Sequence, residues 1–170
     1  MILMGRPIDP DLDPVRGGPE GRRRGGPLSS KLSVGIHILT VLALYTGRPL
    51  TSEEIAESVN TNPVVIRRLL GLLREAGFVE SKTGVGGGWL LLADPERINF
   101  LDILRAVEPH DGMFAMHKSG PNPLCPVGRD ICGVLSGIYA EFEAGMARQL
   151  SCATLACVLG KLKESGALPA

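Results

Sequence analysis

The sequence is poor in aromatic residues, which occupy only 4% of its 170 positions, although 44% of its residues are hydrophobic. We therefore expect an aliphatic core, in a chain long enough for one domain with appendages. The formal net charge is zero, which excludes binding to nucleic acid by overall charge alone. The charge is uneven, however. Residues 32–60 carry one Arg against three Glu, whereas residues 61–98 carry four Arg and one Lys against three Glu and one Asp.

Long hydrophobic runs are also missing. The longest, from Ile36 to Tyr45, includes His37 and Thr40 and is too short to cross a membrane. The N-terminal Met-Ile-Leu-Met lacks the basic start and long apolar centre of a signal peptide, so we expect a cytoplasmic protein without membrane contact. Cysteine occurs only four times, and in the cytosol thiols are more often free, redox-active or metal-bound than paired in disulfides.

The sequence shows no features typical of an enzyme. It has no apparent pairing of a nucleophile with a base, and the glycines at 84 and 86–88 are not followed by the lysine and helix of a phosphate-binding loop.

Residues 1–27 are rich in Pro, Gly and Arg without periodicity, which predicts a disordered extension. Within it, residues 22–24 are three arginines that form either a solvated tail or a basic arm for a DNA minor groove.

Residues 51–77 predict two short helices joined by a tight turn. Thr51 and Glu54 form a capping box at the start of the first helix. Asn62 caps the second helix, Pro63 occupies its first position, and Gly77 ends it. The core-facing side of the second helix shows the i, i+3, i+4, i+7 spacing of Ile66, Leu69, Leu70 and Leu73. The opposite face carries Val64, Arg67, Arg68, Gly71 and Arg74.

The segment that follows predicts a two-stranded ribbon over residues 78–92 with a glycine-rich tip. A helical pair or a β-hairpin alone has an ordinary structural explanation. Together, in this order, they are typical of a winged helix-turn-helix, which places its second helix in the DNA major groove and the ribbon beside it.

The C-terminal part predicts more helix. Asn99 caps a helix over residues 100–107, residues 109–126 form a loop, and a long helix runs from about Val127 to Leu150. One face of the long helix carries Ile131, Leu135, Ile138, Phe142 and Met146, and another carries Gly133, Gly137, Ala140 and Ala144. Two such faces favour a dimerisation helix over a single-chain core helix. Ser151 is expected to cap a final helix.

These elements predict a mainly α fold with a small β-wing. The DNA-binding domain is expected at residues 28–108 and the dimerisation helices at residues 127–170. Three segments carry a resemblance to the Rrf2 family of bacterial winged-helix regulators, namely residues 31–39, 73–91 and 98–108. The resemblance spans about Leu32 to Leu162. It implies a homodimer, joined through the long helix, that binds a near-palindromic DNA operator, and we expect it to act as a repressor.

The resemblance also implies which residues meet DNA. The residues expected to face base edges or phosphates are Asn62, Val64, Val65, Arg67 and Arg68. The tip of the ribbon is expected to lie in or near the minor groove, with Lys82, Thr83, Gly84, Gly86 and Gly87. Many relatives carry a basic residue where this chain has Thr83. Arg67 or Arg68 has the chemistry for a bidentate contact with guanine, and Arg74, a turn or more further along, suits a phosphate. The alternative function is a protein-interaction module that binds a metabolic or assembly enzyme without contacting DNA.

Many Rrf2 regulators hold an iron–sulfur cluster on three cysteines before the long helix. Here only Cys125 resembles one of them, so no cluster is expected, and residues 113–131 resemble the cluster-free branch of the family. At a helix start, Cys125 is either a redox sensor or an idle thiol. Its spacing from His110 and His117 fits no compact metal motif. Small core residues are expected at Cys132, Cys152 and Cys157.

Overall fold

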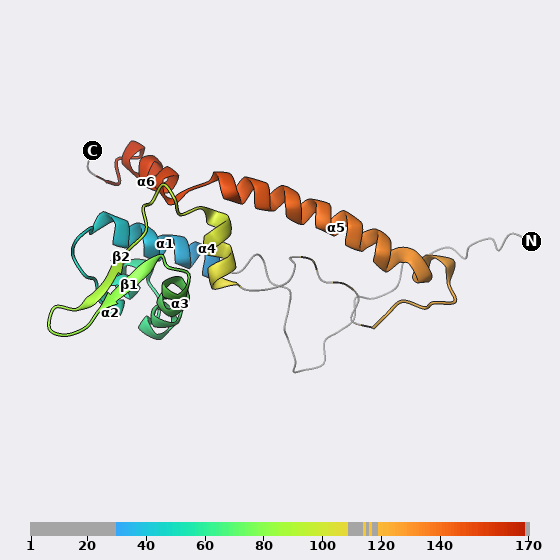
Figure 1. The fold of residues 1–170 in the computed structure, drawn as a ribbon, viewed down its shortest axis with the longest axis horizontal. Coiled ribbons are helices and arrows are strands. Elements are labelled where there is room, and N and C mark those ends of the chain that lie inside the picture. Colours follow the sequence, from blue (N-terminus) through green and yellow to red (C-terminus); the bar gives the residue numbers. More distant parts are fainter. Residues whose placement is uncertain (1–29, 109–113, 115, 117–118, 169–170) are drawn as a thin grey trace, which may run out of the picture.

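The computed structural model describes residues 30–108, 114, 116 and 119–168. The predicted extension at residues 1–27 and the two loop histidines, His110 and His117, lie outside this range. The elements in chain order are α1 (Ser30–Leu44), α2 (Ser52–Val59), α3 (Pro63–Glu75), β1 (Val79–Lys82), β2 (Gly88–Leu91), α4 (Phe100–Val107), α5 (Pro126–Cys152) and α6 (Leu155–Glu164). In Figure 1, α5 projects as a long rod from the other elements, which gather at one end. The predicted fold class is confirmed.

The core is aliphatic, as the composition predicts. Its fully buried side chains come from most of the clustered elements and include Ile38, Leu39, Ile55, Ile66, Leu70, Leu73, Val79, Ile98, Ile103 and Leu155. Helix α1 runs through the middle and is buried on several sides. At Gly35 it approaches α4 so closely that an added Cβ would lie 3.3 Å from side-chain atoms of Ile103 and Val107.

The helix pair α2–α3 forms as its capping residues predict. The Thr51 hydroxyl accepts a hydrogen bond from the Glu54 amide at 3.2 Å, and the Glu54 carboxylate accepts one from the Thr51 amide at 2.8 Å. Asn60 adopts a left-handed conformation with φ of 55° and ends α2. The Asn62 side chain accepts a hydrogen bond from the Val64 amide at 2.8 Å and starts α3. This capping fixes the residue at which α3 begins.

The ribbon is antiparallel, with Val79 opposite Leu91 and Lys82 opposite Gly88. Its second strand also pairs with the segment between α1 and α2. The Leu50 amide donates to the Trp89 carbonyl at 3.0 Å, and the Trp89 amide donates to the Leu50 carbonyl at 2.8 Å. Gly88 makes this approach possible, because a Cβ there would lie 2.6 Å from the Leu50 carbonyl oxygen. Strand β2 is therefore paired on both of its edges, by β1 and by Leu50.

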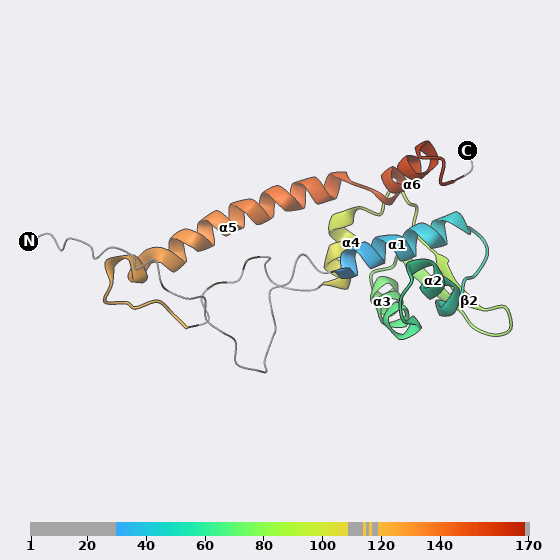
Figure 2. The same ribbon diagram turned by 180° about the vertical axis from the view of Figure 1, so that it is seen from behind.

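Helix α6 returns to the domain. In Figures 1 and 2 it lies beside α1, and the two helices are in contact. Leu155 is fully buried, its amide donates to the Ile98 carbonyl at 2.9 Å, and Thr154 forms a β-bridge with Asn99. Although α6 follows the projecting helix in sequence, it packs against the aliphatic core of the clustered elements. In contrast, no residue of α5 is buried.

Two local predictions are wrong. Ser151 does not cap the last helix, because α5 continues through it and its hydroxyl donates to the Arg148 carbonyl at 2.8 Å. Thr154 is the cap and accepts a hydrogen bond from the Cys157 amide. Cys152 and Cys157 are exposed rather than core residues, and Cys132 is half-buried. Leu155 turns the buried side of α6 inward, and Cys157, two residues on, points away from it.

Candidate nucleic-acid interface

The outer face of α3 begins with two valines. The capped start of the helix positions Val64 and Val65 in its first turn, where their side chains are 64% and 44% exposed. Arg68 follows one turn after Val64 on the same face and is exposed. Among the described residues no carboxylate forms an ion pair with Arg68, so its guanidinium is available to a ligand. The exposed start of α3 therefore presents two apolar groups and one cation.

Arg67 lies on the flank of α3 that faces α2. Its guanidinium donates to the Glu53 carboxylate at 2.5 Å, and both side chains are more than half exposed. The Arg67 hydrogen bond is the main reason that the pKa of Glu53 lies below its usual value. Arg67 is thus presented at the same surface as Arg68 but is already paired within the chain.

Arg74 connects α3 with the ribbon. Its guanidinium carbon lies 6.0 Å from the centre of the Trp89 ring, a cation–π distance. The end of α3 and the second strand are thereby held in one arrangement, with the Arg74 charge between them. This position suits contact with a DNA backbone that passes from helix to ribbon.

The tip of the ribbon follows Lys82, the last residue of β1. Thr83, Gly84 and Gly86 are exposed, and Gly84 and Gly86 have φ of 96° and 76°, in the left-handed region that favours glycine. Gly87 has no room for a side chain, because a Cβ there would lie 2.3 Å from the Lys82 carbonyl oxygen. Sequence reasoning passed over Val85, which is fully exposed at this tip. The sequence signal for this exposure is the position of Val85 between two glycines, Gly84 and Gly86.

Comparison with known proteins identifies the family. The model of the Rrf2 family, described as iron-dependent transcriptional regulators, matches residues 28–161. The chain belongs to the Rrf2 family. YwnA of Bacillus subtilis (strain 168), named a putative HTH-type transcriptional regulator, is 39% identical over 135 residues, which cover 79% of this chain and 98% of YwnA. This Rrf2 protein is accordingly a transcriptional regulator and not an enzyme.

Solved structures agree with this assignment. T. potens IscR is 26% identical to the Rrf2 protein described here, with a TM-score of 0.61, over 81% of this chain and 88% of IscR. CymR (YrzC), the global cysteine regulator of B. subtilis, has a TM-score of 0.60 at 24% identity, over 78% of this chain and 95% of CymR. At 24% identity, the likeness to CymR shows a shared fold alone.

Because regulators of this family are described as iron-dependent, the cysteines are compared with the ligand set of an iron–sulfur cluster. Iron–sulfur clusters need about four thiolate or equivalent ligands. Cys125 occupies the N-cap position of α5, and Cys132 lies seven residues on, about 10 Å along the helix axis. Cys152 is the last residue of α5, and Cys157 lies beyond it in α6. The described residues contain no group of three or more His, Cys, Asp or Glu side chains placed to hold a metal ion. The four cysteines of this chain are therefore not placed to hold a cluster together.

Cys125 occupies the N-cap position of α5 and is exposed. Its Sγ makes no capping hydrogen bond in the structure. The amide groups of Gly128 and Val127 nevertheless favour its thiolate and hold the pKa of the Cys125 thiol below its usual value. The thiol is therefore both accessible and more readily ionised than a free cysteine.

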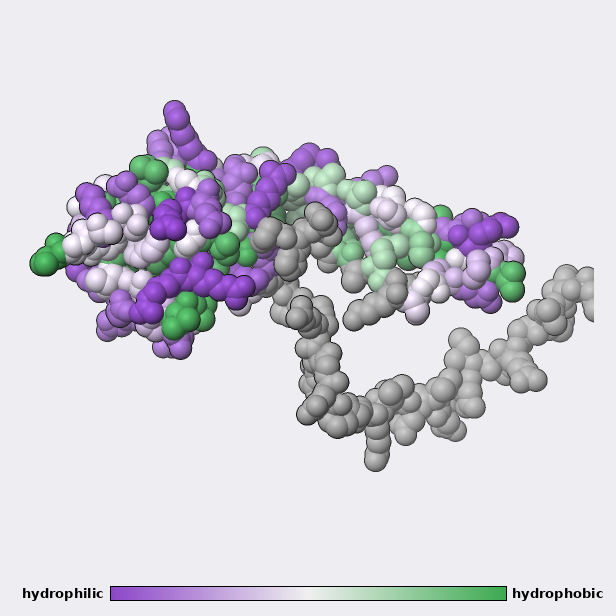
Figure 3. Space-filling model, turned by 60° about the horizontal axis from the view of Figure 1, so that its bottom comes forward, coloured by the Kyte–Doolittle hydropathy of each residue, from purple (hydrophilic) through white to green (hydrophobic). Residues whose placement is uncertain are grey.

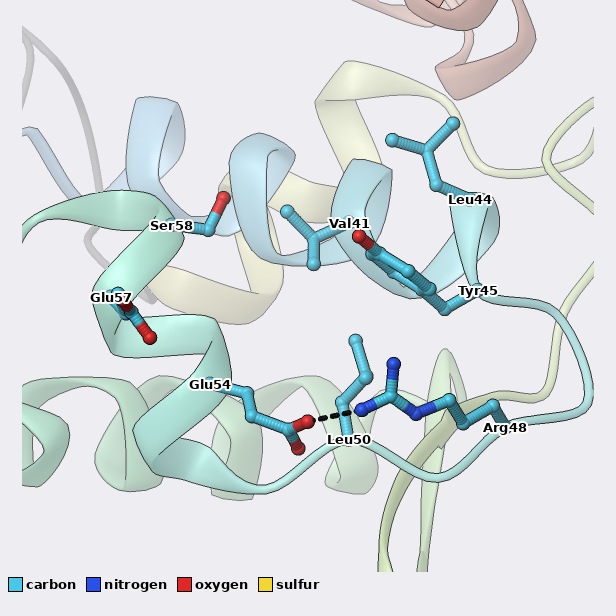
Figure 4. A pocket seen from close by; sticks show the side chains of 8 residues that line it. All are labelled: Val41, Leu44, Tyr45, Arg48, Leu50, Glu54, Glu57 and Ser58. Carbon is cyan, nitrogen blue, oxygen red and sulfur yellow. Dashed lines mark hydrogen bonds and ion pairs between the residues drawn. The ribbon is translucent and has the colours of Figure 1, made fainter. Parts of the chain in front are cut away.

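A pocket of about 390 Å³ lies between α1 and α2, lined by Val41, Leu44, Tyr45, Arg48, Leu50, Glu54, Glu57 and Ser58. Figure 4 shows Arg48 reaching toward Glu54, with which it forms an ion pair. The same guanidinium lies 5.5 Å from the centre of the Tyr45 ring. Because Arg48 is already engaged by these two side chains, we assign the pocket no ligand.

The helices of the described residues include no segment with the length and hydrophobicity that a membrane span requires.

Proposed function

We propose that this Rrf2 protein is a homodimeric, sequence-specific DNA-binding repressor. The observation that carries the proposal is the exposed start of α3, held beside a ribbon by a paired strand segment and a cation–π contact. Such a helix enters the major groove with its first residues toward the base edges. The proposed contacts are those of Asn62, Val64, Val65, Arg67 and Arg68 from the helix, with Arg74 on phosphate. The ribbon tip contributes Lys82, Thr83, Gly84, Gly86 and Gly87.

Helix α5 supports the dimer. It is 27 residues long, and none of them is buried. Val134, Ile138 and Phe142 recur every four residues and are 57%, 41% and 56% exposed. Figure 3 shows hydrophobic groups along the projecting part of the molecule. A second copy packed on this face would remove the apolar surface from water and place two α3 helices on one duplex.

DNA binding is tested first by selecting fragments of the host genome that the protein retains. We expect a short near-palindrome whose affinity falls steeply as salt rises, because phosphate contacts release counterions. Fluorescence anisotropy then compares this operator with a scrambled duplex. Arg68→Ala is expected to lower discrimination by about 1–3 kcal/mol, the worth of a bidentate guanine contact. Arg129→Ala, which removes the same charge at the far end of α5, should leave it unchanged.

A protein-interaction module is the competing function. Arg67 is paired with Glu53, and the ribbon tip has a neutral Thr83. Few cations are therefore left to bind phosphate, which favours the protein-interaction module. No retention of genomic fragments at low salt, with a stable protein complex in a pulldown, would support that function and contradict DNA binding. Reporter expression from the operator with and without the protein tests repression. Higher expression in the presence of the protein would make it an activator.

We further propose that Cys125 responds to thiol oxidation. Its thiolate can attack a peroxide, which breaks the O–O bond, forms a sulfenic acid and releases hydroxide or an alkoxide. The sulfenic acid can then condense with a thiol of a second copy, which forms a disulfide across the dimer and releases water. Mild peroxide is expected to change operator affinity in the wild type, and Cys125→Ser should abolish the change. Cys152→Ser, at another exposed cysteine, is the matched control and should retain it. Unchanged wild-type affinity after peroxide would contradict this role.

A further inference from the structure

The two valines at the start of α3 are unusual occupants of a DNA-reading surface. The first turn of a recognition helix is the part that reaches the base edges, and polar side chains make hydrogen bonds there. Val64 is 64% exposed and Val65 is 44% exposed. Valine is also a poorer helix former than alanine, because its branched side chain loses rotamer freedom. Neither burial nor helix propensity therefore accounts for this pair.

The polar groups around the valines are largely engaged within the chain. The Asn62 side-chain oxygen accepts the Val64 amide at 2.8 Å. Arg67 donates to Glu53 at 2.5 Å. Pro63 has no amide hydrogen to offer. The leading end of α3 thus presents mainly methyl groups, with Arg68 one turn behind. Figure 3, in which the lower side of Figure 1 comes forward, shows green hydrophobic groups among purple hydrophilic ones on this domain.

The major groove offers one apolar feature, which is the C5 methyl group of thymine. We propose that Val64 and Val65 recognise thymine methyl groups in each operator half-site, with the hydrogen-bonded contact of Arg68 next to them. This inference rests on the proposed DNA-binding function and specifies which bases the site selects. The operator should carry thymine where α3 enters the groove, and the selectivity should come from van der Waals contact and exclusion of water rather than hydrogen bonds.

The test removes only the methyl group. Each thymine of the selected operator is replaced in turn by deoxyuridine, which keeps the base pair and its hydrogen-bonding edge. Fluorescence anisotropy measures the dissociation constant for each duplex. For the wild type we expect one or two positions per half-site at which the loss is about fourfold, the effect of one buried methylene-sized group. At the other thymines the substitution should have no effect.

A double-mutant cycle assigns the effect to the valines. Val64→Ala and Val65→Ala remove exposed methyl groups and introduce a better helix former, so both variants should fold. At a sensitive thymine, the fourfold loss should disappear in one of the two variants. Val85→Ala, which truncates a fully exposed valine at the ribbon tip, is the control and should retain the full loss.

The outcomes separate this inference from the proposed function. Operator binding with no uracil-sensitive thymine, or with sensitivity unchanged in both α3 variants, would overturn the methyl contact and leave DNA binding intact. Absence of any operator binding would overturn both. If genomic fragments bind but their amplified, unmodified copies do not, the recognised methyl group belongs to a modified base, and the assignment to thymine is wrong.

Discussion

Replacing Val134 and Ile138 together by glutamate should convert the protein to monomers and weaken operator binding by roughly 10²–10⁴-fold. Both side chains are exposed within the chain, so the variant should fold. Two charges on the apolar face would, however, have to be buried without partners in the dimer. Each separate α3 would then bind its half-site without the effective concentration that its linked twin provides. Sedimentation equilibrium and fluorescence anisotropy measure the two effects.

The choice of positions avoids damage within one chain. Phe142 lies on the same face, but its ring is 6.1 Å from that of Phe114, so its replacement would also disturb this intrachain contact. Ser136→Glu is the matched control, because it adds a charge on roughly the opposite side of α5. It should leave the dimer and the affinity unchanged. A Val134/Ile138 variant that remains dimeric would place the dimer interface elsewhere.

Gly88→Ala should lower the free energy of unfolding by about 1–3 kcal/mol, the usual cost of forcing an extra group into a packed site. The new Cβ would lie 2.6 Å from the Leu50 carbonyl oxygen and 2.8 Å from its carbon. Strand β2 would therefore have to separate from the segment between α1 and α2, breaking the two Leu50–Trp89 hydrogen bonds. Operator affinity should fall as well, since Trp89 also contacts Arg74.

Urea denaturation followed by circular dichroism measures this loss. The matched control is Gly160→Ala in α6, where an added Cβ meets nothing within 4 Å. Because alanine is the better helix former, that variant should gain about 0.5–1 kcal/mol. Equal stability of Gly88→Ala and the wild type would show that the Leu50–Trp89 pairing does not constrain the ribbon.

The parts of the fold that were predicted correctly are those with local causes. The α2–α3 pair follows from the Thr51 capping box, the Asn62 cap and a four-residue core stripe, all within a few residues of one another. The ribbon follows from a glycine stop and a glycine-rich tip. Ser151 misled the prediction because two possible cap residues, Ser151 and Thr154, lie three apart. The choice depends on where α6 docks, which is not a local property.

The candidate site was only partly predictable for the same reason. A helical repeat places Arg67 and Arg68 on the outer side of α3, and both are exposed there. It does not indicate that Glu53, fourteen residues earlier, pairs with Arg67 and leaves Arg68 without a carboxylate partner among the described residues. Likewise, the contact of Arg74 with Trp89 depends on how the ribbon folds back on α3.

The sequence by itself determined the order and type of the elements, because capping hydrogen bonds, glycine conformations and hydrophobic spacing act over a few residues. It also determined that one helix would carry more apolar surface than a small domain covers. Only the tertiary structure decided which cations at α3 remain available, that α6 packs against α1, and that Leu50 holds the ribbon. Those outcomes depend on contacts between residues far apart in the chain, which become specific only when the whole core is assembled.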